Sequence, residues 1–477
     1  MVLSHDLWRW DAARMAAAIR RREVSSREVV SACLARMAAV NPRLNAVTVD
    51  LGAEALAAAD RADAAVLGGE VLGALHGVPI AIKENVDQAR TATTNGVVAF
   101  RDLIATDDSP VVANLRAAGA VIVGRTNTPA FSFRLDTDND LRGPTFNPWS
   151  PRHTPGGSSG GASAAVASGI VPIAHGNDIA GSIRFPAYTC GLAGLRPSFG
   201  RVPAFNPTAT VERAVSSQLL SVQGPIARTV GDVRLALHAM AARDSRDPWW
   251  VPAPLEGGSP ARPLRVAVVT EPDDLCGARV HPSVFEALRR AAAWLHEAGC
   301  EIVDARTPGF TRAAELWFAM QLPEIRVYLW PLIAEHGDEG IRRAMGLMLE
   351  SYGPAGDGVV YMKALAERAR VVREWQRFFD EVPLVLAPVC TEPVYARGFD
   401  LESVERTARL WRECATLMAV PVLGIPGLAV PTAVFDGLPV GVQILAARFR
   451  EDLCLAAGEV IEARAGMTPR LPVDIQW

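Results

Sequence analysis

The sequence is poor in the residues that build metal sites and disulfide frameworks. Its 477 residues include only seven cysteines and eight histidines. No two cysteines form a C-x-x-C pair, and cysteine and histidine never cluster at the spacing of metal ligands. An odd number of scattered cysteines is typical of free thiols in a reducing compartment. We therefore expect a protein that works without a metal or another cofactor.

Long apolar runs and an excess of charge of one sign are absent as well. No stretch reaches the roughly 18 uninterrupted apolar residues that a membrane span requires, and Asp6, Trp8 and Asp11 interrupt any signal-peptide core. Forty-eight basic residues against 52 acidic ones leave a formal net charge of −4, which removes the simplest argument for a nucleic-acid binder. The basic run Arg20 to Arg22 is interpreted as the solvated face of a helix. We expect a cytoplasmic monomer or homodimer that binds neither nucleic acid nor membrane.

The residues that are present indicate a soluble α/β enzyme. Apolar residues make up 49% of the chain and charged ones 21%, the balance of a globular protein. Short apolar runs at 78–82, 121–123 and 171–174 read as strands, and segments 111–118 and 162–168 have helical character. Strands that alternate with helices predict a largely parallel sheet covered by helices.

Further elements are predicted along the rest of the chain. No fixed-period repeat is found, which excludes solenoids and propellers. The predicted elements are helices in 11–40 (with a cap at Ser25-Ser26) and 53–67, a Pro- and Gly-rich surface connection at 251–263, a strand at 264–269, a helix at 283–298, an aromatic-rich helical segment at 310–375, and a hairpin at 428–445 that turns at Asp436-Gly437.

Two loops of small residues, 156–161 and 176–182, carry the strongest chemical signal. The first runs straight into a predicted helix, which argues against a flexible linker. It lacks the G-x-x-x-x-G-K-[ST] and G-x-G-x-x-G patterns of phosphate cradles. It does match the G-x-S-x-G elbow of α/β-hydrolases, but those enzymes need a histidine close to the C-terminus, and the last histidine here is His336.

Three spaced motifs give a better match. GGSSGG at 156–161 is followed by the serine of D-I-A-G-S-I-R-F-P, Ser182, and is preceded by the lysine of V-P-I-A-I-K-E-N, Lys83. This set resembles the amidase signature family over about residues 11–464. The resemblance implies one α/β domain over 1–477, with a large mixed sheet covered by helices on both faces, a signature core at about 75–230 and a substrate-side helical region at about 310–375.

The resemblance also implies the site residues. Ser182 would be the nucleophile, Lys83 the base, and Ser158, after a cis peptide bond, the bridge between them. Lys83 ends an apolar strand, and desolvation there disfavours its charged form, so a neutral lysine is a chemically reasonable base. The oxyanion hole would consist of the backbone N–H groups of Ile179, Ala180, Gly181 and Ser182.

Departures from the family pattern concern the substrate more than the chemistry. Ala180 stands where glycine is usual, Asn177 where threonine or serine is usual, and Ala130 where glutamate is usual. By resemblance the neighbouring residues Phe131, Ser132, Phe133 and Leu135 would lie beside the substrate.

The mostly apolar character of 131–135 and 310–375 favours hydrophobic or aryl substrates. The predicted function is therefore hydrolysis of hydrophobic or aryl carboxylic amides, with aryl esters and carbamates as further substrates. The alternative is the glutaminase component of a tRNA-dependent amidotransferase, against which no R-Y-D-G segment is found.

Overall fold

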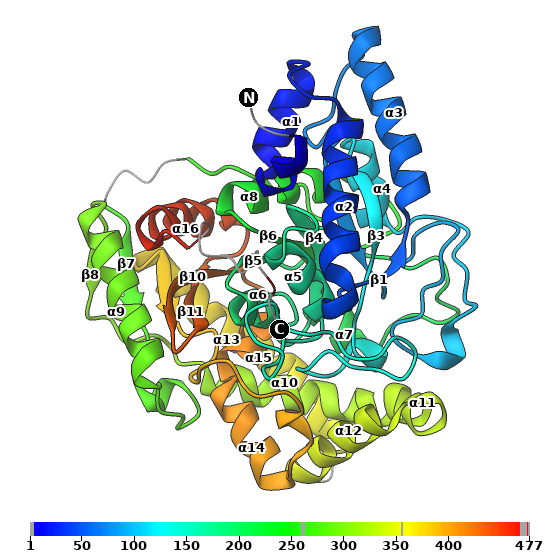
Figure 1. Cartoon of the computed structure of the whole chain (residues 1–477). Coiled ribbons are helices and arrows are strands. Elements are labelled where there is room, and N and C mark those ends of the chain that lie inside the picture. Colours follow the sequence, from blue (N-terminus) through cyan, green and yellow to red (C-terminus); the bar gives the residue numbers. More distant parts are fainter. Residues whose placement is uncertain (1–3, 259–262, 354–355, 468–474, 476–477) are drawn as a thin grey trace.

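A computed structural model describes residues 4–258, 263–353, 356–467 and 475. One mixed sheet of 11 strands runs through the molecule (Figure 1). In spatial order the strands are β1 (Val47–Asp50), β3 (Val121–Thr126), β2 (Pro79–Lys83), β4 (Ile173–Asp178), β6 (Val222–Ala227), β5 (Ala193–Arg196), β10 (Gly427–Phe435), β11 (Leu438–Ala446), β9 (Leu384–Ala387), β7 (Arg265–Val268) and β8 (Glu301–Val303).

Parallel pairing is concentrated at two places in this sheet. β2 lies between β3 and β4 and runs parallel to both, and β7 likewise runs parallel to β8 and β9. The strands between these two groups pair antiparallel. The carboxyl ends of β2 and β4 therefore meet at one edge of the sheet, which brings the loops after Lys83 and Asp178 together.

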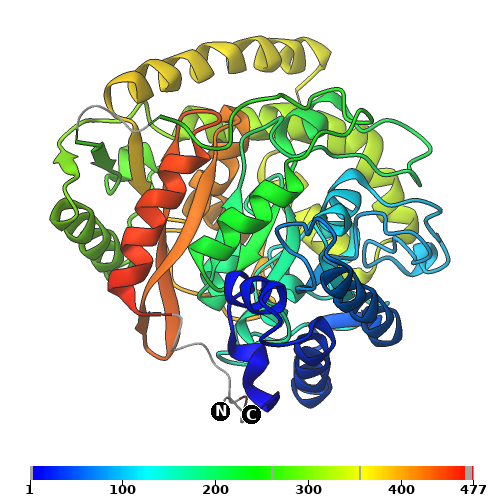
Figure 2. The same cartoon turned by 90° about the horizontal axis from the view of Figure 1, so that it is seen from above.

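Helices cover both faces, as expected, and Figure 2 shows them on either side of the twisted strands. A side chain at Gly427 of β10 would face α6 and α15, whereas the next residue, Leu428, faces α16. The helices are α1 (Ala12–Arg20), α2 (Ser26–Leu44), α3 (Gly52–Gly68), α4 (Pro110–Ala117), α5 (Gly160–Ala167), α6 (Arg184–Cys190), α7 (Val215–Leu220), α8 (Val230–Met240), α9 (Pro282–Glu297), α10 (Thr311–Glu324), α11 (Trp330–His336), α12 (Glu339–Ser351), α13 (Gly358–Glu381), α14 (Val404–Glu413), α15 (Ala415–Leu423) and α16 (Glu451–Ala465).

Most local predictions agree with these elements. Ser25 caps α2 through a capping box with Glu28, the arrangement that a serine followed by glutamate three residues later favours. The strand predicted at 171–174 is displaced: it begins at Ile173, after Pro172, and continues to Asp178. Proline has no N–H to give to a neighbouring strand, and the small residues Gly176 and Asn177, assigned to a loop, pair with β6 instead.

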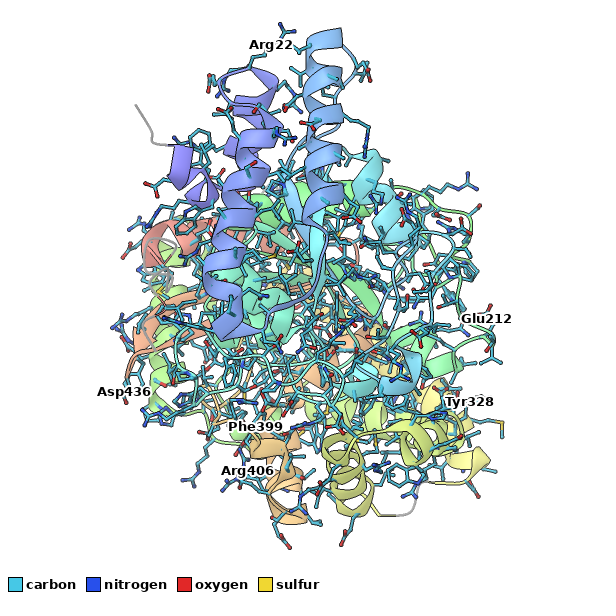
Figure 3. The ribbon with its side chains drawn as sticks, turned by 45° about the vertical axis from the view of Figure 1, so that its right-hand side comes forward. Arg22, Glu212, Tyr328, Phe399, Arg406 and Asp436 are labelled. Carbon is cyan, nitrogen blue, oxygen red and sulfur yellow. The ribbon has the colours of Figure 1, made fainter. Side chains whose placement is uncertain are left out.

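The aromatic-rich segment 310–375 forms α10, a π-helical turn (Ile325–Leu329), α11, α12 and most of α13. Trp317 and Met345 are buried in its core, whereas Tyr328 is 57% exposed and projects outward (Figure 3). Residues 354–355 of the segment lie outside the described residues. No helix in the described part of the chain is both long and apolar enough to span a membrane.

The hairpin turn between β10 and β11 provides a test of this fold. Asp436 and Gly437 both have positive φ, 49° and 78°, as a two-residue hairpin turn of type I′ requires. A Cβ at Gly437 would contact nothing within 4 Å, so Gly437→Ala should cost only the backbone strain, about 1–2 kcal/mol. We expect a lower Tm by thermal denaturation.

Gly346 of α12 is the matched control. It is helical, and a Cβ there also contacts nothing within 4 Å. Gly346→Ala should therefore stabilise the protein by about 0.5–1 kcal/mol, because alanine is the better helix former. A neutral Gly437→Ala substitution would contradict the assigned turn.

Candidate active site

Lys83 lies at the carboxyl end of β2 and is completely buried. Residues 79–82 before it are buried throughout, and their strand pairs with β3 on one side and β4 on the other. Lys83 Nζ lies 2.7 Å from Ser158 Oγ, 3.0 Å from Ser159 Oγ and 2.7 Å from Asn177 Oδ1. Burial lowers the pKa of Lys83 well below its usual value, against the opposing effect of the Asp178 carboxylate.

Ser158 is held by close backbone contacts on the loop that enters α5. The peptide bond between Gly157 and Ser158 is cis. A Cβ at Gly157 would lie 2.3 Å from the carbonyl oxygen of Arg134 and 2.8 Å from the carbonyl carbon of Leu135. Only glycine fits there, so the segment 134–135 packs directly against the backbone that carries Ser158.

Ser182 lies on the loop between β4 and α6. Its side chain is 7% exposed, and its hydroxyl has no hydrogen-bond partner within the part of the chain that the structure describes. The structure thus joins Lys83 to Ser158 by a hydrogen bond and leaves the Ser182 hydroxyl free of the pair. Gly181 next to it has φ +97°, and a Cβ there would lie 2.8 Å from the Leu417 side chain.

Asp178 organises the loop that carries Ser182. Its carboxylate accepts N–H groups from Gly181 at 2.8 Å and Ile183 at 3.3 Å, and it pairs with Arg184 at 3.0 Å. The carboxylate, Arg184 and Arg196 are all fully buried. Burial opposes ionisation of Asp178, but the two arginines hold its pKa below the usual range.

The four backbone N–H groups predicted for the oxyanion hole differ in availability. The N–H of Gly181 is used by Asp178. Those of Ile179, Ala180 and Ser182 donate to no acceptor among the described residues. The carbonyl of Ile179 accepts the indole N–H of Trp317 at 2.9 Å, which ties the loop to α10.

A chain of side-chain amides extends from Lys83, and it was missed by the sequence reasoning. Asn177 Nδ2 donates to Asn85 Oδ1 at 3.0 Å, and Asn85 Nδ2 donates to Ser132 Oγ at 2.9 Å. Ser132 in turn donates to Asn95 Oδ1 at 2.6 Å. The unusual Asn177 was the one available signal, because an amide carries its acceptor and its donors on separate atoms and can bridge two partners.

His175 is the histidine nearest to this cluster in sequence, and the structure gives it another partner. It lies on β4, and its Nε2 is 2.8 Å from Gln223 Oε1. Burial lowers its pKa to about 3, so the imidazole stays neutral at ordinary pH. No group of three or more His, Cys, Asp or Glu side chains that could hold a metal ion occurs among the described residues.

The predicted substrate residues lie around the 3₁₀ turn Ala130–Ser132 and just after it. Phe131 and Ser132 both have positive φ, 56° and 55°, an uncommon conformation for such side chains that is concentrated at functional sites. Phe133 and Leu135 line a small pocket against α12 and α14. A second pocket of about 200 Å³ lies behind Ala130, next to His336 and Asp338.

Comparisons with known proteins identify the class of enzyme that has this mixed sheet and this buried lysine–serine cluster. The Amidase family model matches residues 28–455. An indoleacetamide hydrolase of Bradyrhizobium diazoefficiens is 48% identical over 97% of this chain and 87% of its own length. A component of the glutamyl-tRNA(Gln) amidotransferase of Rhodopirellula baltica is 33% identical over 94% of this chain and 95% of its own.

A solved structure agrees with these sequence matches. A bacterial aryl acylamidase of the amidase signature family superimposes with a TM-score of 0.82 at 27% identity, covering 98% of each chain. The present chain therefore belongs to the amidase signature family and is a hydrolase that acts on amide C–N bonds.

The buried pair of Asp178 and Arg184 gives a testable consequence. Asp178→Asn would leave Arg184 and Arg196 without a counter-charge at full burial, which typically costs about 3–5 kcal/mol. The free energy of unfolding, measured by denaturant titration, should fall by that amount. Glu374→Gln removes one of the two partners of Arg370 at an exposed ion pair and should change the free energy of unfolding by less than about 1 kcal/mol. Equal effects of the two substitutions would contradict the structural role of Asp178.

Proposed function

We propose that this enzyme hydrolyses amides of aryl-substituted acids, of the indoleacetamide kind, through an acyl-enzyme on Ser182. The observation that carries the proposal is the fully buried Lys83 amine, 2.7 Å from the Ser158 hydroxyl. A serine hydroxyl is a weak nucleophile until a base removes its proton. Lys83, whose pKa burial depresses, is the base that the cluster offers.

The neighbours of Lys83 favour the neutral amine in one orientation. A neutral amine has two N–H donors and one lone pair. Asn177 Oδ1 can only accept, so it takes one N–H, and Ser159 Oγ at 3.0 Å takes the other. The lone pair then faces Ser158 Oγ, which is the orientation that Lys83 needs to accept the proton of that hydroxyl.

The reaction follows from this arrangement. On substrate binding Ser158 gives its proton to Lys83 and takes the proton of Ser182, whose Oγ attacks the amide carbon. Ser158 then donates the proton that it took from Ser182 to the nitrogen as the C–N bond breaks and the amine leaves, and Lys83 returns its proton to Ser158. Water repeats the sequence on the acyl-enzyme and releases the acid. The hydrogen bond between Ser158 and Ser182 forms in the substrate complex, where such contacts commonly tighten.

The negative charge of the tetrahedral intermediate falls on backbone donors. We assign this role to the N–H groups of Ile179, Ala180 and Ser182, which have no other acceptor in the described structure. Gly181 keeps its N–H for Asp178 and thereby fixes the curvature of the loop. A single donor of this kind contributes about 3 kcal/mol to the transition state.

The aryl preference has two supports. The relative at 48% identity is named an indoleacetamide hydrolase, and the residues around the predicted substrate segment are mostly apolar. The amidotransferase alternative is less supported, because the relative of that kind reaches only 33% identity. Aryl esters and carbamates are expected as further substrates, since both present a carbonyl carbon to the same nucleophile.

Ser182→Ala tests the nucleophile. The substitution removes one small hydroxyl that makes no hydrogen bond within the described structure, so the Tm should stay within about 2 °C. Hydrolysis of indole-3-acetamide, followed by ammonia release, should fall by more than about a hundredfold. Retention of a larger share of the wild-type rate would exclude Ser182 as the attacking group.

Lys83→Ala tests the proton relay. An amine leaves badly unless it is protonated, whereas a nitrophenolate leaves unaided. The substitution should therefore lower kcat/KM for an aryl anilide by several orders of magnitude more than for the nitrophenyl ester of the same acid. Equal losses on both substrates would mean that Lys83 only maintains the site.

The pH dependence of the wild-type acylation rate tests the same relay independently. Neutral Lys83 is the active form, and burial lowers its pKa below the usual 10.5. The rate should thus rise with pH and level off well below pH 10.5, as measured by single-turnover kinetics. A rate that still rises at that pH would show that Lys83 keeps an ordinary pKa.

A further inference from the structure

The small pocket beside Phe133 and Leu135 has a mainly apolar lining that comes from four parts of the chain. They are the segment 133–135, α12, the 3₁₀ turn Phe399–Leu401 and α14. Its lining residues are Phe133, Arg134, Leu135, Ala344, Met345, Met348, Asp400, Thr407, Leu410 and Trp411. The charges of Arg134 and Asp400 neutralise each other in a buried bidentate pair, so the lining presents a mainly apolar surface.

The lining of the pocket is connected to the two loops that carry the reacting groups. On one side, residues 134–135 pack against Gly157, the residue before Ser158. On the other side, Trp411 stacks on Trp317 with ring centroids 6.2 Å apart, and Trp317 donates its N–H to Ile179 next to the proposed oxyanion hole. The pocket lining therefore contacts the loop of Ser158 directly and is connected to the loop of Ser182 through Trp317.

Two polar atoms of the lining are buried and have no hydrogen-bond partner among the described residues. They are Thr407 Oγ1 and Trp411 Nε1. The two residues are four apart on α14 and so share one helix face. Buried polar atoms without a partner are rare and call for an explanation such as a ligand or an ordered water. Figure 3 shows α14, which carries the labelled Arg406, at the margin of the molecule.

We propose that this pocket binds the aromatic ring of the substrate and that Thr407 accepts a hydrogen bond from a ring N–H. The ligand class is an aryl ring with one N–H on its edge, of the indole type. The inference rests on the proposed function, because it assigns this pocket to the aryl group on the acid part of the proposed substrate. Trp411 forms a wall for the ring.

The pocket is narrow before the ring enters. Its free space is about 20 Å³, room for about one water molecule. Met345 and Met348 are 1% and 2% exposed and occupy the side toward α12. Methionine side chains are unbranched and adapt their shape readily, so these two side chains are the ones that an entering ring would displace.

The binding of two ligands, one with the ring N–H and one without it, to a variant that lacks the proposed nucleophile tests this assignment. The protein is Ser182→Ala, with and without Thr407→Val, and the ligands are indole-3-acetamide and 1-naphthaleneacetamide, which lacks the N–H. Isothermal calorimetry gives Kd for each pair. Thr407→Val should weaken indole binding by about 5- to 15-fold and leave naphthalene binding within about twofold. Thr407→Ser keeps the hydroxyl and should restore most of the indole affinity.

Three results would overturn the proposal. In the first, Thr407→Val weakens the binding of both ligands equally, which would mean that the hydroxyl holds a structural water. In the second, Thr407→Val weakens the binding of neither ligand. In the third, neither ligand binds to Ser182→Ala. Turnover by the wild-type enzyme is measured separately. If the enzyme hydrolyses other amides but no arylacetamide, the proposed substrate is wrong. If it hydrolyses both arylacetamides but Thr407→Val changes the Kd of the two ligands equally, only the proposed pocket is wrong.

Discussion

The burial of one amine, that of Lys83, is the constraint on which the site depends. An ammonium ion at full burial is tolerated only beside an unpaired negative charge. The nearest candidate, Asp178, is already paired with Arg184 and Arg196. Lys83 therefore meets hydroxyl and amide oxygens alone in its immediate contacts, and the neutral amine is the form that this environment favours.

The loops that carry Ser158 and Ser182 are also held in place by contacts with the rest of the fold. Asp178 shapes the loop of Ser182, and the close contact at Gly157 joins the loop of Ser158 to residues 134–135. Trp317 connects the Ser182 loop to the aromatic cluster of α10 and α14. The helical region and the loop of Ser182 are thus joined by one hydrogen bond and one ring contact.

Much of this could be predicted from the sequence, for identifiable reasons. Apolar runs and turn residues located β2, β3 and the hairpin of β10 and β11, because those signals are local. The strands β1, β5, β8 and β9 were not predicted: they have only three or four residues each and their pairing partners are distant in sequence. The six-residue strand β6 was not predicted either. The hydrogen-bonded chain from Asn177 through Asn85 to Ser132 and the lining of the pocket by α14 likewise depend on tertiary contacts.

The protonation state of Lys83 can be measured directly, because the chain contains only one other lysine, Lys363. Lysine labelled with carbon-13 at Cε should give two side-chain signals by NMR, and Lys363→Arg assigns them. The account predicts that the Lys83 signal titrates with a midpoint well below 10.5, the ordinary lysine value. A Lys83 signal that stays in the protonated form up to that pH would contradict it.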